Sequence, residues 1–163
     1  MESVNITAVF DELWKNIELI NEKKDSSSYF QGKDNYICLI ENDSKELMDK
    51  AIAQKLIESS IDIDKGGVAI ALAKMAVLSN IGCEVNISVE NEIDIFNNSL
   101  GKLVVEVKPE NIQSFNDIAL ELDINYTCIG KTGGDVLFIN GLYKNMDKVK
   151  DTYLNKGILN ARF

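Results

Sequence analysis

The residues best suited to chemistry form a short polar turn that ends in two glycines and leads into an alanine-rich helix. The turn contains Asp62, Asp64 and Lys65, and Gly66-Gly67 follow directly. Adjacent glycines permit positive φ values and let another group approach the backbone closely. The first N–H groups of a helix and its positive dipole end favour phosphate binding. The pattern indicates either a phosphate-binding turn or a tight turn that seats the helix, and the residues alone favour the tight turn.

The charged residues of this turn have simpler interpretations as well. Asp62 is expected to cap the following helix through backbone N–H groups rather than to bind a metal. Lys65 is expected to be solvated, with an anionic ligand as the alternative. Acidic clusters in so acidic a chain usually face solvent, so neither Asp62 nor Asp64 is assigned an acid–base role. The sequence predicts no metal ligands and no catalytic residues.

The chain has no histidine, which excludes a Ser-His-Asp or Cys-His catalytic group and any imidazole base. Cys38, Cys83 and Cys128 each lie in an apolar, strand-like run, and no two of them have the spacing of metal ligands. We interpret all three as reduced, buried thiols. Any chemistry must therefore use carboxylates, lysine, backbone amides or residues of another chain.

Composition limits the class of protein. The 163 residues are 45% hydrophobic and 26% charged, which predicts one ordinary globular domain with an N-terminal arm. The net charge of −9 argues against nucleic acid and anionic membranes as partners. No apolar run approaches the roughly 18 residues that a membrane span needs. No signal peptide is visible, which favours the cytoplasm.

The first part of the chain predicts an arm and the start of a domain, with residues 1–33 as an amphipathic helix plus polar linker and 34–163 as the domain. The helix, 6–20, carries an apolar stripe that must pack on the domain or on a partner. A strand is expected at Tyr36–Ile40. A helix from Asp43 to Ser59 follows, with Asp43 and Glu46 as a capping box and with an inner face of Leu47, Ala51, Ile52 and Leu56.

The remaining elements alternate irregularly. The glycine-led helix has Val68, Leu72, Met75, Ala76 and Ser79 on its inner face, while small alanines let other elements cover its remaining sides. Strands are expected at 83–87, 103–107, 126–129 and 136–139, the last two joined by a hairpin connection at 131–135. A short helix at 91–98, a helix opened by Pro109 and a weaker helix at 146–154 complete the chain. This mixture favours an α+β domain with a mixed sheet layered with helices.

Three segments together resemble the purM-like C-terminal domain of enzymes related to aminoimidazole ribonucleotide (AIR) synthase. Residues 66–76 resemble the family's glycine-led helix. Residues 95–107, which begin Ile-Phe-Asn-Asn-Ser-Leu-Gly, are similar to its "Leu-Phe-Asn-Glu-Ser-Leu-Gly" turn and central strand. Residues 129–135 are similar to its "Ile-Gly-x-Val-x-x-Gly-Asp" hairpin. The segments occur in the family's order, and the chain looks most like the C-terminal domain of phosphoribosylformylglycinamidine synthase.

This resemblance implies a part of an ATP- and Mg²⁺-dependent ligase of de novo purine biosynthesis. Such ligases convert a carbonyl oxygen to an amine through a phosphorylated intermediate, using ammonia from a glutaminase domain or subunit. Nothing in the chain matches their N-terminal domain, so the implied partners are the missing N-terminal domain or domains, the glutaminase and, as a further option, a second copy. Neither ATP nor Mg²⁺ is expected to bind this chain tightly, and the isolated chain is expected to be inactive.

The glycine turn matches the family only in part. The family turn usually reads His-Asp-x-Ser-Asp-Gly-Gly, and here Asp62, Gly66 and Gly67 match it. Asp64 replaces the serine and opposes phosphate, which Lys65 partly offsets as a point charge. The resemblance thus implies a phosphate or substrate contact at Asp62, Lys65, Gly66 and Gly67.

Two alternatives remain open from the sequence. One is a non-catalytic assembly module that retains the fold and docks through the apolar stripe of the first helix, formed by Val9, Phe10, Leu13, Trp14 and Ile17. The other is a domain of a different AIR synthase-related enzyme, such as a selenophosphate synthetase-like or kinase-like protein.

Overall fold

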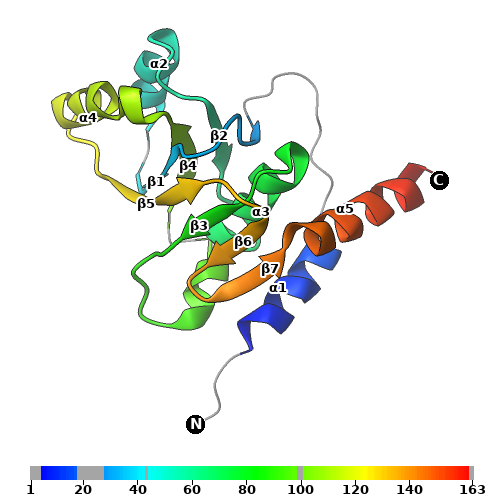
Figure 1. Cartoon of the computed structure of the whole chain (residues 1–163). Helices are drawn as coiled ribbons and strands as arrows, with labels where there is room; N and C mark the ends of the chain where they lie inside the picture. Colours follow the sequence, from blue (N-terminus) through cyan, green and yellow to red (C-terminus); the bar gives the residue numbers. More distant parts are fainter. Residues whose placement is uncertain (1–4, 18–27, 43, 99–100, 162–163) are drawn as a thin grey trace.

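The computed structural model describes residues 5–17, 28–42, 44–98 and 101–161. Within these ranges the chain forms a seven-stranded mixed sheet in the order β2-β4-β1-β5-β3-β6-β7 (Figure 1). The strands are β1 (Tyr36–Ile40), β2 (Ser59–Asp62), β3 (Cys83–Val85), β4 (Leu103–Val107), β5 (Tyr126–Thr132), β6 (Val136–Ile139) and β7 (Leu142–Asn145). The helices are α1 (Ile6–Lys15), α2 (Lys45–Ala53), α3 (Gly67–Ser79), η2 (Glu92–Phe96), η3 (Pro109–Asn111), α4 (Ile112–Glu121) and α5 (Met146–Ala161). The expected α+β class is confirmed.

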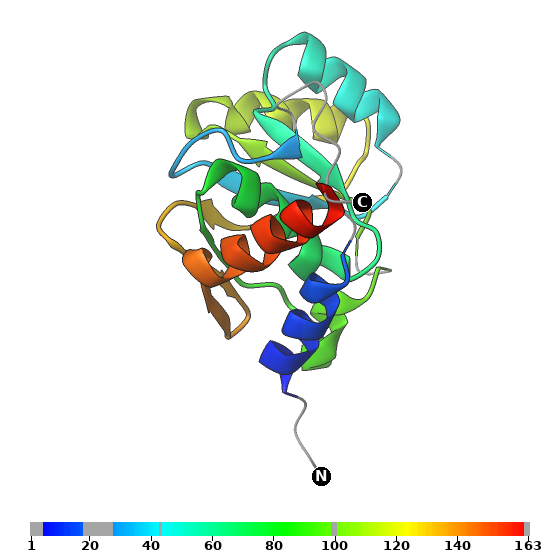
Figure 2. The same ribbon diagram turned by 90° about the vertical axis from the view of Figure 1, so that its right-hand side faces the viewer.

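Helices cover both faces of the sheet. Helices α2 and α4 pack together over β1 and β4, whereas α1, α3 and α5 lie on the opposite face (Figures 1 and 2). The strands alternate accordingly: Leu39 of β1 faces α3, and its neighbours Cys38 and Ile40 face α2 and α4. The two faces have separate hydrophobic clusters, and strands β1 and β4 contribute to both.

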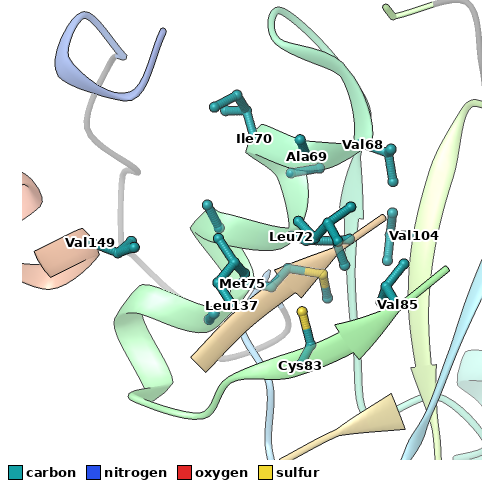
Figure 3. Packing of buried hydrophobic residues seen from close by; sticks show 14 of the residues in the cluster. Val68, Ala69, Ile70, Leu72, Met75, Cys83, Val85, Val104, Leu137 and Val149 are labelled. Atoms are coloured by element: carbon teal, nitrogen blue, oxygen red, sulfur yellow. The ribbon is translucent and has the colours of Figure 1, made fainter. Parts of the chain in front are cut away.

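Helix α3 is the centre of the larger cluster and is buried on almost every side. Val68, Leu72 and Met75 pack toward strands β3, β4 and β6, as Figure 3 shows. Ala69, Ala71 and Ala73 are also buried, which confirms that small residues let further elements cover this helix. Asn80 ends the helix in the left-handed conformation, with φ 57°.

Helix α1 packs inside the chain rather than standing free. Phe10 and Trp14 are buried, and their rings stack with centroids 5.9 Å apart. The Trp14 ring also stacks on Tyr153 of α5, and its Nε1–H donates to the Val149 carbonyl at 2.9 Å. Most of the stripe expected to dock on a partner in the assembly-module alternative is therefore covered by α3 and α5. Ile20 lies outside the described residues.

The helix expected from Asp43 to Ser59 is wrong in its extent. Helix α2 ends at Ala53 because Lys55 adopts φ 59° and the Leu56 N–H donates to the Ala51 carbonyl, a helix-ending arrangement. Residues 59–62 then form edge strand β2, antiparallel to β4. Ile52, expected to face inward, is 58% exposed. Asp43 lies outside the described residues.

The hairpin connection expected at 131–135 is also wrong. Strand β3 lies between β5 and β6, antiparallel to the first and parallel to the second. Gly82 makes this insertion possible, since a Cβ there would lie 2.2 Å from the Val136 carbonyl oxygen. Its N–H and C=O pair with Gly134 and Gly133 at 2.9 and 2.8 Å.

The C-terminal region contains more structure than the sequence pattern predicts. Strands β6 and β7 form a hairpin through Asn140-Gly141, which adopt φ 51° and 95°. An Asn-Gly pair with two positive φ values is a strong hairpin signal, and the sequence analysis overlooked it. Helix α5 reaches Ala161, beyond the expected end at Leu154. None of the helices in the described ranges has the length and apolar character needed to cross a membrane.

A fully buried carboxylate holds the segment before β1 on the sheet. Glu106, in β4, is 0% exposed. Its oxygens accept hydrogen bonds from the Gln31 N–H at 2.9 and 3.2 Å and from the Gly32 N–H at 3.2 Å. Asn35 Nδ2 donates at 2.7 Å and Ser59 Oγ at 2.6 Å. These donors let the acid remain away from water, because a buried polar group is tolerated when it is hydrogen-bonded.

Replacing Glu106 with glutamine should destabilise the fold strongly. The amide would turn an NH₂ group toward donors, so buried N–H and O–H groups would lose their acceptor. We expect Glu106→Gln to lower the free energy of unfolding by about 2–4 kcal/mol in urea titrations. The control is Glu84→Gln, at an exposed strand position, which should change it by less than about 0.5 kcal/mol. Equal effects of the two changes would contradict this role.

Candidate functional site

The predicted site lies where the edge strand β2 turns into helix α3. Strand β2 ends at Asp62, and Gly66 occupies the N-cap position of α3 with φ 86°. Gly67 also has a positive φ of 69°, and its N–H donates to the Asp64 carbonyl at 3.0 Å. Both glycines therefore use backbone freedom that other residues lack. Asp62 is not the N-cap residue of α3, so its expected capping role is wrong.

Gly67 seats α3 against the second family-like segment. A Cβ at Gly67 would lie 2.5 Å from the Phe96 carbonyl carbon and 2.7 Å from the Asn97 nitrogen. The two signature segments are thus in direct backbone contact, although they are far apart in sequence. Ser99 and Leu100, in the same segment, lie outside the described residues. The arrangement supports the interpretation that the glycine pair is a tight turn that seats the helix.

The four predicted site residues do not converge on one hollow. Asp62 lines a hollow of about 640 Å³ beside β2, called here the β2 hollow. Its other lining residues are Asn42, Ser44, Lys45, Met48, Ser60, Ile63, Lys102 and Leu103. Lys65 and Gly66 line a separate hollow of about 490 Å³, whereas Gly67 is buried. The structure therefore brings Lys65 and Gly66 together and separates them from Asp62.

The second hollow, called here the α1–α3 hollow, has the same charged lining as the β2 hollow, two lysines and one aspartate, and differs from it by its position at the start of α3. It is lined by Leu13, Asn16, Ile17, Asp64, Lys65, Gly66, Ile70 and Lys74. The first turn of α3 adds the positive end of its dipole there. Lys74, which lies further along α3, lines the same hollow but was not among the predicted site residues. A lysine eight residues, or about 2.2 helical turns, after the glycine cap was the available signal.

Metal binding has no comparable support. Among residues 5–17, 28–42, 44–98 and 101–161, no group of three or more Cys, Asp or Glu side chains is placed to hold a metal ion. The acceptors that do converge, the oxygens of Glu106, are occupied by protein donors.

The third family-like segment has a structural role on the same face as Glu106. Thr132 Oγ1 donates to the Gly32 carbonyl at 2.7 Å and accepts from the Asn35 N–H at 3.0 Å. The Asp34 N–H donates to the Thr132 carbonyl at 2.8 Å. These bonds fix residues 32–35 at the start of β1.

The cysteines differ from the expectation in one important respect. Cys38 and Cys83 are buried free thiols, as predicted, but Cys128 is exposed. Cys38 and Cys128 are directly opposite each other on β1 and β5, with their Sγ atoms 3.4 Å apart. The contact between Cys38 and Cys128 follows from the register of β1 and β5. Residues 90 positions apart in sequence give no local signal of such a contact.

Comparison with known proteins finds relatives in sequence and in fold. No protein-family model matches the chain. Phosphoribosylformylglycinamidine synthase subunit PurL of Sulfurimonas denitrificans is 39% identical over 110 residues, which are 68% of this chain and 15% of that protein. PurL of Campylobacter curvus is 28% identical over 154 residues, 94% of this chain and 19% of that protein. The chain thus spans less than a fifth of these curated relatives.

A solved structure shares the fold. The structure of Thermotoga maritima PurL in complex with ATP matches 77% of this chain and 27% of that chain, with a TM-score of 0.60 and 16% identity. The sequence and fold matches together show that this chain contains a PurL-like domain, and they confirm the resemblance stated from the three segments.

The seating role of Gly67 predicts a specific loss of stability. Gly67→Ala would place a Cβ against backbone atoms of residues 95–97 and would also strain a positive φ. Gly134→Ala is the matched control, since its φ of 74° is similar and its Cβ would meet nothing within 4 Å. We expect Gly134→Ala to lower the free energy of unfolding by about 1–2 kcal/mol. Gly67→Ala should cost about 2 kcal/mol more, measured by urea titration. A smaller loss at Gly67 than at Gly134 would contradict the seating role.

Proposed function

We propose that this chain acts as the C-terminal domain of a PurL-type phosphoribosylformylglycinamidine synthase, a cytoplasmic, ATP-dependent ligase of purine biosynthesis. The observation that carries the proposal is the identity to PurL across most of the chain. Two of the three family-like segments also meet in space, since Gly67 packs directly on the Phe96-Asn97 turn. Function is better argued from local arrangements of this kind than from the overall fold.

The proposed domain works only together with other parts of the enzyme. The match covers a small share of PurL, so the remaining machinery has to come from further domains. The proposed partners are the N-terminal domain or domains of the same ligase and a glutaminase domain or subunit that supplies ammonia. A homodimer is a further possible arrangement. ATP and Mg²⁺ belong to the complete assembly in this proposal, and this chain contributes one wall of the site.

Within that wall we assign the phosphate or substrate contact to the α1–α3 hollow. Lys65 and Lys74 would meet negatively charged oxygens as point charges. Gly66 lines the same hollow, and a Cβ there would lie 2.3 Å from the Ile70 side chain, so the glycine is needed for helix packing. Asp64 lines the same hollow and would weaken phosphate binding, so a modest contribution to affinity is expected. Asp62 would contribute only through the neighbouring β2 hollow.

The structure removes the main reason for considering an assembly module. That alternative relied on an exposed stripe along α1, and Phe10, Trp14 and Ile17 are buried within the chain. The other alternative, a domain of a different AIR synthase-related enzyme, is less favoured because the sequence relatives given above are PurL proteins.

Complementation tests the ligase proposal directly. PurL of Sulfurimonas denitrificans would be produced without the 110 matched residues, and this chain would be added in trans. We expect ammonia- and ATP-dependent amidination to rise at least about tenfold above that of the truncated enzyme, because the missing wall of the site is restored. This chain alone serves as the control and should be inactive. No gain over the truncated enzyme would contradict the proposal.

Two lysine variants test which hollow meets the phosphate. In the complemented enzyme, Lys65→Ala should raise KM for ATP or the phosphoribosyl substrate about fivefold to tenfold, the loss of one charge-assisted contact. Lys102 lines the β2 hollow, so Lys102→Ala should leave KM for ATP and KM for the phosphoribosyl substrate unchanged. A higher KM in Lys102→Ala, with no change in Lys65→Ala, would assign the phosphate contact to the β2 hollow instead. No effect of either change would remove the assignment while leaving the ligase proposal intact.

A further inference from the structure

Two thiols on neighbouring central strands form an arrangement that the proposed ligase function does not use. Cys38 of β1 is 0% exposed, whereas Cys128 of β5 is open to solvent. Their sulfur atoms lie 3.4 Å apart. A small reagent can reach Cys128, and Cys128 is the group in contact with the sulfur of Cys38.

We propose that Cys38 and Cys128 are a thiol modification site, at which a low-molecular-weight disulfide such as oxidised glutathione converts the pair to a cross-strand disulfide. This inference does not depend on the proposed ligase function.

The strand geometry suits the new bond. Cys38 and Cys128 are register partners in an antiparallel pair. Directly opposite residues of such pairs have Cα atoms about 4.5–5.5 Å apart. Disulfides span Cα separations of about 4.4–6.8 Å, so the strands need not move apart to allow the bond. The register of the two strands shifts next to this pair, between Ile37 and Cys38.

The two thiols also differ in acidity: the exposed Cys128, which a reagent can reach, is the more acidic of the two. A hydrogen bond from the Cys38 thiol lowers the pKa of Cys128 to about 7. The same hydrogen bond and burial raise the pKa of Cys38 far above its usual range. A thiolate is the nucleophile in thiol–disulfide exchange. Cys128 is therefore the attacking group, and Cys38 is the thiol that closes the bond.

The reaction balances in two exchanges. The Cys128 thiolate attacks one sulfur of the small disulfide, whose S–S bond breaks, and one small thiolate leaves. The mixed disulfide on Cys128 is then attacked by the Cys38 sulfur, whose proton passes to the departed thiolate. This breaks the mixed S–S bond and releases the second small thiolate, which takes from water the proton that Cys128 lost earlier. Two protein thiols are oxidised by two electrons, and one small disulfide is reduced to two thiols.

Cys83 provides an internal control within the same chain. It is buried in the cluster around α3, and burial raises the pKa of its thiol to about 12. Its register partners are Thr132 and Leu137, so neither neighbour is a thiol. Cys83 should remain reduced under conditions that oxidise the other two cysteines.

Peptide mapping of the full chain tests the proposal. Reduced protein would be incubated with oxidised glutathione under native conditions, alkylated to block free thiols, digested and analysed by mass spectrometry. We expect a peptide pair linked through Cys38 and Cys128, with Cys83 alkylated. Cys38→Ala should instead accumulate glutathione on Cys128. Cys128→Ser should slow the loss of the Cys38 thiol at least about tenfold, because the accessible nucleophile is gone.

Three results would overturn the proposal. The first is a wild-type chain that stops at the mixed disulfide on Cys128. The second is a yield of Cys83-containing disulfides equal to that of the Cys38–Cys128 bond. The third is loss of the Cys38 thiol in Cys128→Ser at the wild-type rate. Because Cys128 is exposed, its replacement by serine should leave the fold intact, and circular dichroism would verify this.

Discussion

A buried carboxylate near the end of β4 joins three parts of the chain that are distant in sequence. Glu106 takes donors from residues 31–35 before β1 and from Ser59 of the edge strand β2. The same segment is tied to α3 through the Phe30 N–H and to β5 through Thr132. The position of the segment that enters β1 is therefore set by polar contacts. With this segment fixed, the register of β1 is set, and alternate residues of β1 point to the hydrophobic clusters on opposite faces of the sheet.

The periodic elements of the fold could be predicted from the sequence, and the short polar ones could not. The bounds of β4 and β6 follow from runs of branched residues, and α3 follows from its glycine start and Asn80 end. Strand β2 begins with two serines and contains a single apolar residue, Ile61, so its pattern carries no strand signal of its own. It is a strand because its backbone pairs with β4 and because the Ser59 hydroxyl donates a hydrogen bond to Glu106. Tertiary context overrides propensity there.

The candidate site shows the same limit at the level of single residues. The sequence singled out the glycine pair correctly as a place of close approach, and the structure identifies the approaching group as the backbone of Phe96 and Asn97. Asp62 and Lys65 are only three residues apart, yet they line different hollows because the chain changes from strand to turn between them. Lys74 joins Lys65 only once α3 and α1 are packed. Spacing along the chain does not reveal which side of a turn each side chain faces.

The placement of β3 between β5 and β6 has a consequence for the order of folding. Segments 126–132 and 136–139 are neighbours in sequence, yet they cannot zip together locally, since each must find β3 from an earlier part of the chain. Such distant pairing carries a loop-closure entropy that local hairpins avoid. We expect the β6–β7 hairpin to dock on the sheet only after β3 is in place, because β6 joins the sheet through β3. We therefore expect the chain to fold more slowly than it would if these two segments paired in a local hairpin.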